Sequence, residues 1–261
     1  MRSLYAIYRK EMGHYFVSPI AYVVVGIFLA LTAFFFNYFV RAVLQEAMQM
    51  QMQQMQTGAA THFDTTMEVV QAFFGMLPTL ILFLTPMLTM GVFAEERKRG
   101  TMELLMTSPV TEIQIVLGKF LASLTLFAIM LLGTVGYLAL IYMRSQPVPP
   151  WRMLLAGYLG VLLLGGCLLA LGSFISSLTE NQLIAAVLTF AAFLMVWVID
   201  LGSSAGGGVG SVLQYLSVTR PYEDFSRGII DTSGLIYYLS FIFFFIFLTV
   251  RSVDSMRWRK A

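Results

Sequence analysis

The chain has 261 residues, of which 58% are hydrophobic and 11% are charged, and its mean hydropathy is +0.79. These values exclude a soluble globular domain and predict an all-α integral membrane protein with a single transmembrane domain over residues 1–261. The formal net charge of +2 does not indicate a nucleic-acid partner, because the position of basic residues relative to the apolar segments matters more.

Residues 2–17 predict an amphipathic helix that lies in the membrane interface. Helical spacing puts an apolar set on one side, and Arg2, Arg9 and Lys10 fall largely on the other. The apolar set is Leu4, Ile7, Tyr8, Tyr15 and Phe16. The alternative is a plain first turn of the following span, but Ser18-Pro19 separates the two.

Six apolar segments follow, each close to or above the roughly 17 residues needed to cross a bilayer. They cover about 20–40, 76–93, 118–143, 153–177, 183–201 and 234–250. Six crossings place both termini on one side. Eleven Lys and Arg residues lie on the side of the termini and of the 95–119 connection, against five on the other, so the sequence predicts cytoplasmic termini.

The first external connection, about 41–75, is rich in methionine. Met48, Met52 and Met55 follow Leu44 at helical spacing, which predicts that the first span continues outward as an amphipathic helix. Thioethers are also ligands for Cu(I), but no His or Cys joins this stripe.

The stretch from Glu95 to Lys119 is the longest charged interruption between two apolar segments. Five consecutive charges, 95–99, cannot lie in hydrocarbon, where each would cost roughly 2.5–3.5 kcal/mol. Gly100-Thr101, a run of helix formers and Thr107-Ser108-Pro109 come next, before the capping box of Thr111 and Gln114. We therefore predict a short amphipathic helix, about 95–109, between the second and third spans.

Proline, glycine and cap residues in the second half of the chain predict turns, close helix packing and a helix start. Pro147, Pro149 and Pro150 predict a stiff external hairpin, and the glycines within 153–177 predict close helix packing. Thr179-x-x-Gln182 predicts a capping box after a very short turn.

The connection 202–233 holds a glycine-rich run and an apolar piece too short to cross the membrane. It either re-enters the membrane from outside or lies on the surface as a helix.

The sequence carries no catalytic constellation. His14 and His62 fall on opposite sides of the predicted topology, and Gly118-Lys119 lacks the other residues of a phosphate-binding loop. We expect no cofactor and no metal in this chain. Asp200, at the end of the fifth span, fits an interfacial carboxylate better than a buried ion site.

The pattern F-x-x-E-x-x-x-G-T-x-E-L-L-x-x-x-P from Phe93 to Pro109, followed by Gly118-Lys119, resembles the permease subunits of ABC exporters of the ABC-2 membrane family. The resemblance covers nearly the whole chain. Within the family, residues 222–252 are most similar to the gliding-motility permease subgroup (GldF and its relatives).

The resemblance implies a non-catalytic permease in the bacterial inner membrane, paired with a second permease chain, either a copy or a paralogue. A separate dimer of ABC ATPase subunits would bind ATP and magnesium, and a GldG-like auxiliary protein is a further expected partner. By position, the ATPase-coupling contacts would be Glu95, Glu96, Arg97, Arg99, Gly100, Thr101, Glu103, Leu104 and Leu105. The outer gate would include Leu213, Tyr215, Leu216, Tyr222 and Phe225.

Three alternatives stay open at this point. A stand-alone secondary transporter or channel would need intramembrane charges or an inverted repeat, and a membrane hydrolase would need paired catalytic side chains. The basic residues Arg97, Lys98 and Arg99 could also serve only to fix topology and to contact lipid head groups.

Overall fold

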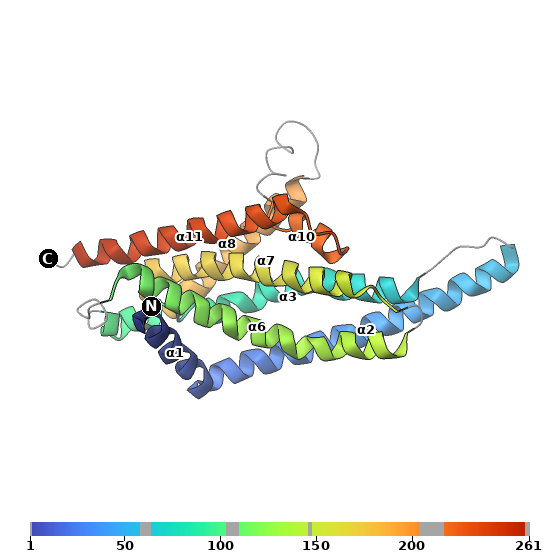
Figure 1. Ribbon diagram of the computed structural model, residues 1–261, viewed down its shortest axis with the longest axis horizontal. Helices are drawn as coiled ribbons and strands as arrows, with labels where there is room; N and C mark the ends of the chain where they lie inside the picture. The colour runs from blue at the N-terminus through green and yellow to red at the C-terminus, as the bar shows by residue number, and fades with distance from the viewer. Residues whose placement is uncertain (1, 58–63, 103–109, 146–147, 204–216, 259–261) are drawn as a thin grey trace.

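The computed structural model describes residues 2–57, 64–102, 110–145, 148–203 and 217–258. Every regular element in this part of the chain is a helix, and the long helices run side by side as a bundle (Figure 1). The elements are α1 (Arg2–Val17), α2 (Pro19–Thr57), α3 (Thr65–Thr89), α4 (Ala94–Lys98), α6 (Glu112–Arg144), α7 (Trp151–Leu178), α8 (Gln182–Ser203), α10 (Arg220–Ser226) and α11 (Thr232–Trp258).

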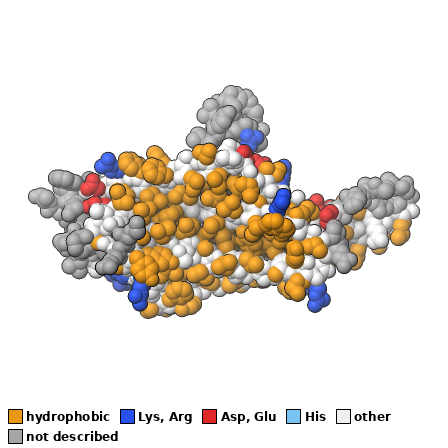
Figure 2. All heavy atoms as spheres, viewed as in Figure 1, with side chains coloured by type: hydrophobic (Ala, Val, Ile, Leu, Met, Phe, Trp, Pro, Cys, Tyr) orange, Lys and Arg blue, Asp and Glu red, His pale blue; other side chains and the backbone are white. Residues whose placement is uncertain are grey.

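The bundle has the surface of a membrane protein. Hydrophobic side chains cover the middle of the face seen in Figure 2, whereas charged side chains gather toward its ends. Five stretches of the described chain are long and apolar enough to cross a bilayer: Pro19–Gln53, Thr65–Lys98, Glu112–Arg144, Trp151–Leu178 and Thr232–Ser255. The remaining predicted span, 183–201, lies in α8, whose described apolar part, Gln182–Val198, is shorter.

Helix α1 and the C-terminal end of α11 lie at one end of the bundle, together with α4 and the start of α6 (Figure 1). We call this the terminal end, and the opposite end, where α2 leads to α3 and α6 leads to α7, the distal end. The sequence-based expectation that the termini and the 95–119 connection share one side of the bundle is thus confirmed.

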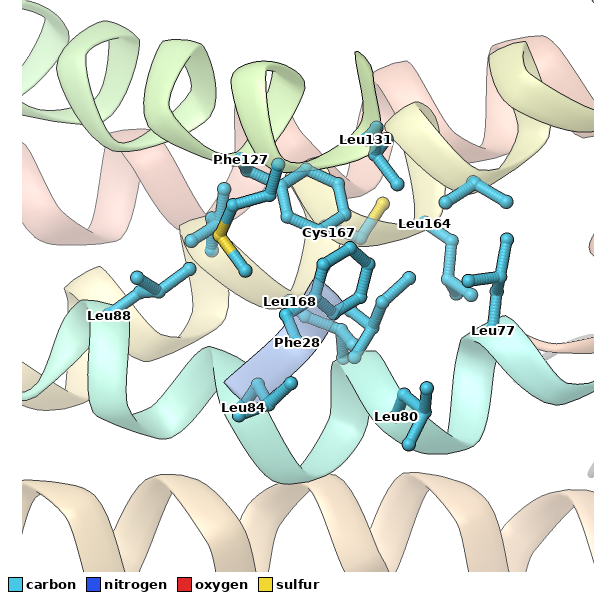
Figure 3. Packing of buried hydrophobic residues seen from close by; sticks show 14 of the residues in the cluster. Phe28, Leu77, Leu80, Leu84, Leu88, Phe127, Leu131, Leu164, Cys167 and Leu168 are labelled. Atoms are coloured by element: carbon cyan, nitrogen blue, oxygen red, sulfur yellow. The ribbon is translucent and has the colours of Figure 1, made fainter. Parts of the chain in front are cut away.

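Helix α7 lies at the centre of the packing, and its glycines allow the neighbouring helices to come close. A Cβ atom at Gly165 would lie 2.1 Å from the Phe127 ring of α6, and one at Gly172 would lie 2.4 Å from Thr89 Oγ1 of α3. Leucine and phenylalanine side chains of α2, α3, α6 and α7 fill the space between these backbones (Figure 3). The predicted close packing of 153–177 is confirmed.

Helix α1 is separate from α2, with Ser18 between them, as the sequence predicts. Its apolar side, however, packs largely on protein. Ile7 is 8% exposed, and a Cβ atom at Gly118 of α6 would lie 2.8 Å from the Ile7 side chain. Tyr8 donates a hydrogen bond to Thr125 Oγ1 of α6 at 3.3 Å. The helix is therefore part of the bundle, although Tyr5, Phe16 and Val17 stay exposed at 62%, 50% and 82%.

Helix α2 has 39 residues, about 58 Å at 1.5 Å per residue, and so continues beyond the predicted span 20–40. Met48, Met52 and Met55 are 61%, 66% and 80% exposed, so the methionine stripe faces away from the bundle core. The predicted outward helical extension is confirmed.

Of the two predicted capping boxes, the structure contains the one at the start of α6 but not the one at the start of α8. Gln114 Oε1 accepts a hydrogen bond from the Thr111 backbone N–H at 3.4 Å, which completes the predicted capping box of α6. The second predicted box, Thr179-x-x-Gln182, is wrong. Asn181 caps α8 instead, because its Oδ1 accepts the Leu183 N–H at 2.9 Å while Thr179 Oγ1 accepts the Asn181 N–H at 3.2 Å.

Candidate functional site

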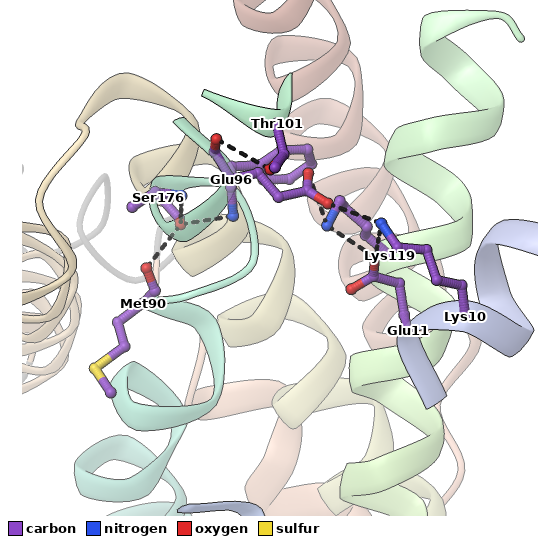
Figure 4. Close-up of polar contacts among 9 residues, drawn as sticks. Lys10, Glu11, Met90, Glu96, Thr101, Lys119 and Ser176 are labelled. Atoms are coloured by element: carbon purple, nitrogen blue, oxygen red, sulfur yellow. Dashed lines mark hydrogen bonds and ion pairs between the residues drawn. The ribbon is translucent and has the colours of Figure 1, made fainter. Parts of the chain in front are cut away.

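The candidate site is a cluster of charged side chains at the terminal end, where α1, α4 and α6 meet. Lys119 of α6 is 2% exposed, and its Nζ lies 3.1 Å from Glu11 Oε1 of α1 and 3.1 Å from Glu96 Oε2 of α4. Lys10 Nζ lies 3.3 Å from the other Glu96 oxygen. Figure 4 shows Lys119 between the two carboxylates. One buried cation thus joins three helices.

Local structure explains why this lysine is buried. Lys119 lies in the first turns of α6, and α1 crosses α6 closely because Gly118 leaves room for Ile7. The ring of Phe93 adds a cation–π contact, with its centroid 5.5 Å from Nζ. A buried ammonium is stable only with close counter-charges, and two carboxylates supply them here.

A serine of α7 fixes the turn between α3 and α4. Ser176 Oγ accepts hydrogen bonds from the backbone N–H groups of Phe93 and Ala94, each at 3.2 Å. The same hydroxyl donates to the Met90 carbonyl at 3.1 Å (Figure 4). A single side chain therefore provides partners for three backbone groups around the start of α4 and connects this turn to the central helix.

Arg97 joins α4 to the end of α7. Its Nη1 donates to the Ser177 carbonyl at 2.8 Å, and its Nη2 donates to Glu180 Oε1 at 3.0 Å. A cation at a helix C-terminus interacts favourably with the helix dipole and with the last free carbonyls. The pair of Arg99 and Glu95, at 2.5 Å within one helical turn, is more exposed and contributes less.

The predicted coupling contacts fall partly on described residues. Six of them, Glu95, Glu96, Arg97, Arg99, Gly100 and Thr101, lie in α4 and the turn after it. Glu103, Leu104 and Leu105 lie outside the described residues. The prediction of one helix over 95–109 needs correction, because α4 ends at Lys98 and Gly100 takes a φ of +70°, which ends the helix before Thr101 and Met102 turn helical again.

The sequence interpretation missed four members of this site: Lys10, Glu11, Lys119 and Ser176. Lys119 contributes to the predicted membrane topology and to the Gly118-Lys119 part of the family pattern, but the sequence predicts no ion pair for this side chain. The available signal was its position, since Lys119 is the only charged residue in the predicted span 118–143. A lone cation in an apolar helix requires a counter-charge from elsewhere in the chain.

The described members of the predicted outer gate are buried side chains that pack α10 against the bundle. Tyr222 and Phe225 of α10 are 3% and 0% exposed. Tyr222 Oη donates to the Phe74 carbonyl of α3 at 2.6 Å, and Phe225 packs against Gly160 of α7. Both side chains hold α10 against the bundle. Leu213, Tyr215 and Leu216 lie outside the described residues.

Among the described residues, no group of three or more His, Cys, Asp or Glu side chains is placed to hold a metal ion. The site consists of ion pairs and hydrogen bonds that tie one short helix to its neighbours. Such an arrangement can transmit movement between elements, since a displacement of α4 strains its bonds to α1, α6 and α7 together.

The long apolar helices, the hydrophobic surface and the polar cluster at one end define a multi-pass helical membrane protein. In a comparison with protein families, the family model described as ABC-2 family transporter protein matches residues 5–253 of this chain. The chain therefore belongs to the ABC-2 transporter family. A search of curated proteins found no match. Membership implies a membrane component of an ABC transporter that associates with an ABC ATPase.

Proposed function

We propose that this chain is the permease subunit of an ATP-driven exporter and that α4, with the turn after it, receives the movement of a separate ATPase. The observation that supports this most strongly is the attachment of α4 to three other helices. Lys119 connects it to α1 and α6, while Ser176 and Arg97 connect it to α7.

The contacts of α4 with α6 and α7 can pass a movement of α4 on to the bundle. A push on α4 would reach α6 through the buried ion pair of Lys119 and Glu96. Separating these two charges inside the protein is costly, so α4 and α6 are expected to move together. The push would reach α7 through the hydrogen bonds of Ser176 and Arg97. Since α7 packs at the centre of the bundle, movement of its terminal end would displace the helices around it.

The proposal extends to membrane and partners. The excess of eleven Lys and Arg residues over five supports a cytoplasmic terminal end. The bacterial inner membrane is proposed from the resemblance to ABC-2 exporter permeases. Two permease chains, identical or paralogous, would form the pathway above an ATPase dimer that binds ATP and magnesium. Membership of the gliding-motility subgroup, with a GldG-like partner, rests on the similarity of residues 222–252.

The test is ATPase coupling in a reconstituted complex. We expect the double variant Glu103→Ala/Leu104→Ala to insert normally, to copurify with less ATPase and to lose stimulation of ATP hydrolysis. The double variant Gln45→Ala/Gln49→Ala, on the distal extension of α2, is the matched control and should keep full stimulation. Full coupling in the Glu103/Leu104 variant would contradict the proposed contact surface.

A stand-alone transporter or channel is the rival function. Vesicles that contain only this chain separate the two functions, because the proposed permease requires ATP and its ATPase for transport. Substrate movement in such vesicles without any ATPase would favour the rival.

A further inference from the structure

A cavity of about 310 Å³ lies beside the charged cluster at the terminal end. Helices α1, α2, α3, α4 and α6 contribute to its walls. Its volume falls at the lower end of the roughly 300–1,000 Å³ typical of ligand pockets. The coupling role proposed above leaves this cavity without a function.

One wall of the cavity is charged and balanced in sign. Three cations and three carboxylates line it: Lys10, Arg99, Lys119, Glu11, Glu95 and Glu96. Lys119 is 98% buried and paired with Glu11 and Glu96, so this wall is built into the fold. The side chains of Lys10 and Arg99 are 60% and 64% exposed. Each has more N–H donors than its ion pairs use, since an ammonium has three and a guanidinium five.

The other wall is apolar and belongs to membrane-spanning helices. Ala21 and Val24 of α2, Leu88 of α3 and Leu126 of α6 line it. Charged and apolar walls thus meet in one cavity at the level where the spans end. A ligand that satisfies both walls must itself be amphiphilic.

Tyr15 of α1 also lines the cavity. Burial, and secondarily the charge of Glu11, raise the pKa of its phenol, which therefore stays neutral and able to donate a hydrogen bond. It adds a polar group without adding charge between the two walls.

We propose that this cavity binds one zwitterionic glycerophospholipid from the surrounding leaflet, with its phosphate at Lys10 and Arg99, its ammonium toward the carboxylates and an acyl chain along the apolar wall. A purely anionic head group would add net negative charge to a wall whose three cations are already paired with its three carboxylates. A soluble phosphate compound would leave the apolar wall in contact with water. The balanced charge and the two walls together favour the zwitterionic lipid.

The bound lipid would act as an additional link between α1, which carries Lys10, and the turn that follows α4, which carries Arg99. Because these elements form the charged cluster, lipid occupancy would stiffen the segment proposed to receive the ATPase. The binding site itself depends only on the bilayer, so it can be tested without any ATPase.

The test measures lipid binding to the purified full chain in detergent by native mass spectrometry. The probes are phosphatidylethanolamine, phosphatidylglycerol and diacylglycerol with the same acyl chains, plus soluble glycerophosphoethanolamine. The variant is Lys10→Ala/Arg99→Ala. Its matched control is Arg9→Ala/Lys98→Ala, which removes two exposed neighbouring cations that do not line the cavity.

We expect phosphatidylethanolamine to bind most tightly and the Lys10/Arg99 variant to weaken it about tenfold or more, as the loss of charge-assisted hydrogen bonds implies. The Arg9/Lys98 control should bind like the parent chain. Equal losses in the two variants would overturn the proposal, since they would indicate general surface attraction. Tighter binding of phosphatidylglycerol, or equal binding of diacylglycerol or of the soluble head group, would overturn it as well.

Discussion

Lys119 Nζ lies 3.1 Å from Glu96 Oε2, and this contact joins the start of one membrane helix to the short helix that ends the previous membrane segment. The lysine is 2% exposed and the glutamate 15%, so water screens the pair little. Removing one partner leaves the other charge buried, which is why this pair is expected to control both the stability and the coupling of the terminal end.

The first prediction concerns Lys119 itself. Lys119→Met leaves Glu11 and Glu96 without their buried counter-charge and should reduce the free energy of unfolding by about 3–5 kcal/mol. Thermal unfolding can be followed through Cys167, the single cysteine, which is buried and reacts with a thiol dye only after the bundle opens. The control Lys98→Met removes an exposed cation and should change stability by less than about 0.5 kcal/mol. Equal stability of the two variants would show that the ion pairs do not hold the helices together.

The second prediction compares two serines on α7. Ser176→Ala deprives the buried N–H groups of Phe93 and Ala94 of their acceptor and should cost about 1–3 kcal/mol. Ser173 is also buried, and within the described structure its hydroxyl has no hydrogen-bond partner. Ser173→Ala should therefore be neutral or stabilising in the same Cys167 assay. A larger loss from Ser173→Ala than from Ser176→Ala would refute the assigned role of Ser176.

The third prediction tests the glycine packing of α7 against α6. Gly165→Ala places a methyl group 2.1 Å from the Phe127 ring and should destabilise the bundle by about 1–3 kcal/mol through overpacking. Gly136→Ala is the matched control on α6, because a Cβ atom there meets nothing within 4 Å. It should leave the temperature of the Cys167 unfolding curve unchanged or raise it slightly, because alanine favours the helix over glycine. If both variants unfold at the same temperature, the helices are less closely packed than described.

Local chemistry made much of the fold predictable from the sequence. Apolar length indicated the long helices, Ser18-Pro19 the break between α1 and α2, and the Thr111–Gln114 pair the start of α6. The cap of α8 was mispredicted because Thr179 and Asn181 are both good cap residues. The short turn lets Thr179 Oγ1 accept the Asn181 N–H, which places the Asn181 side chain at the helix end.

The candidate site was only half predictable. The charge run 95–99 indicated α4, because charges cannot lie in hydrocarbon, but the predicted helix continued to about 109 and so missed the turn at Gly100. The partners of α4 come from distant parts of the chain, Lys10 before the first span and Ser176 near the end of the fourth. No local pattern links such positions, so the buried network became visible only when the helices were placed in space.

The central claim is that the turn after α4 meets an ATPase. The most direct measurement places a photo-crosslinking residue at the exposed Thr101 and, as a control, at the exposed Met52 of the distal extension, in membranes that contain the ATPase partner. We predict cross-links to the ATPase from position 101 and none from position 52. Cross-links from position 52, or none from position 101 in a complex that hydrolyses ATP, would contradict the proposed function.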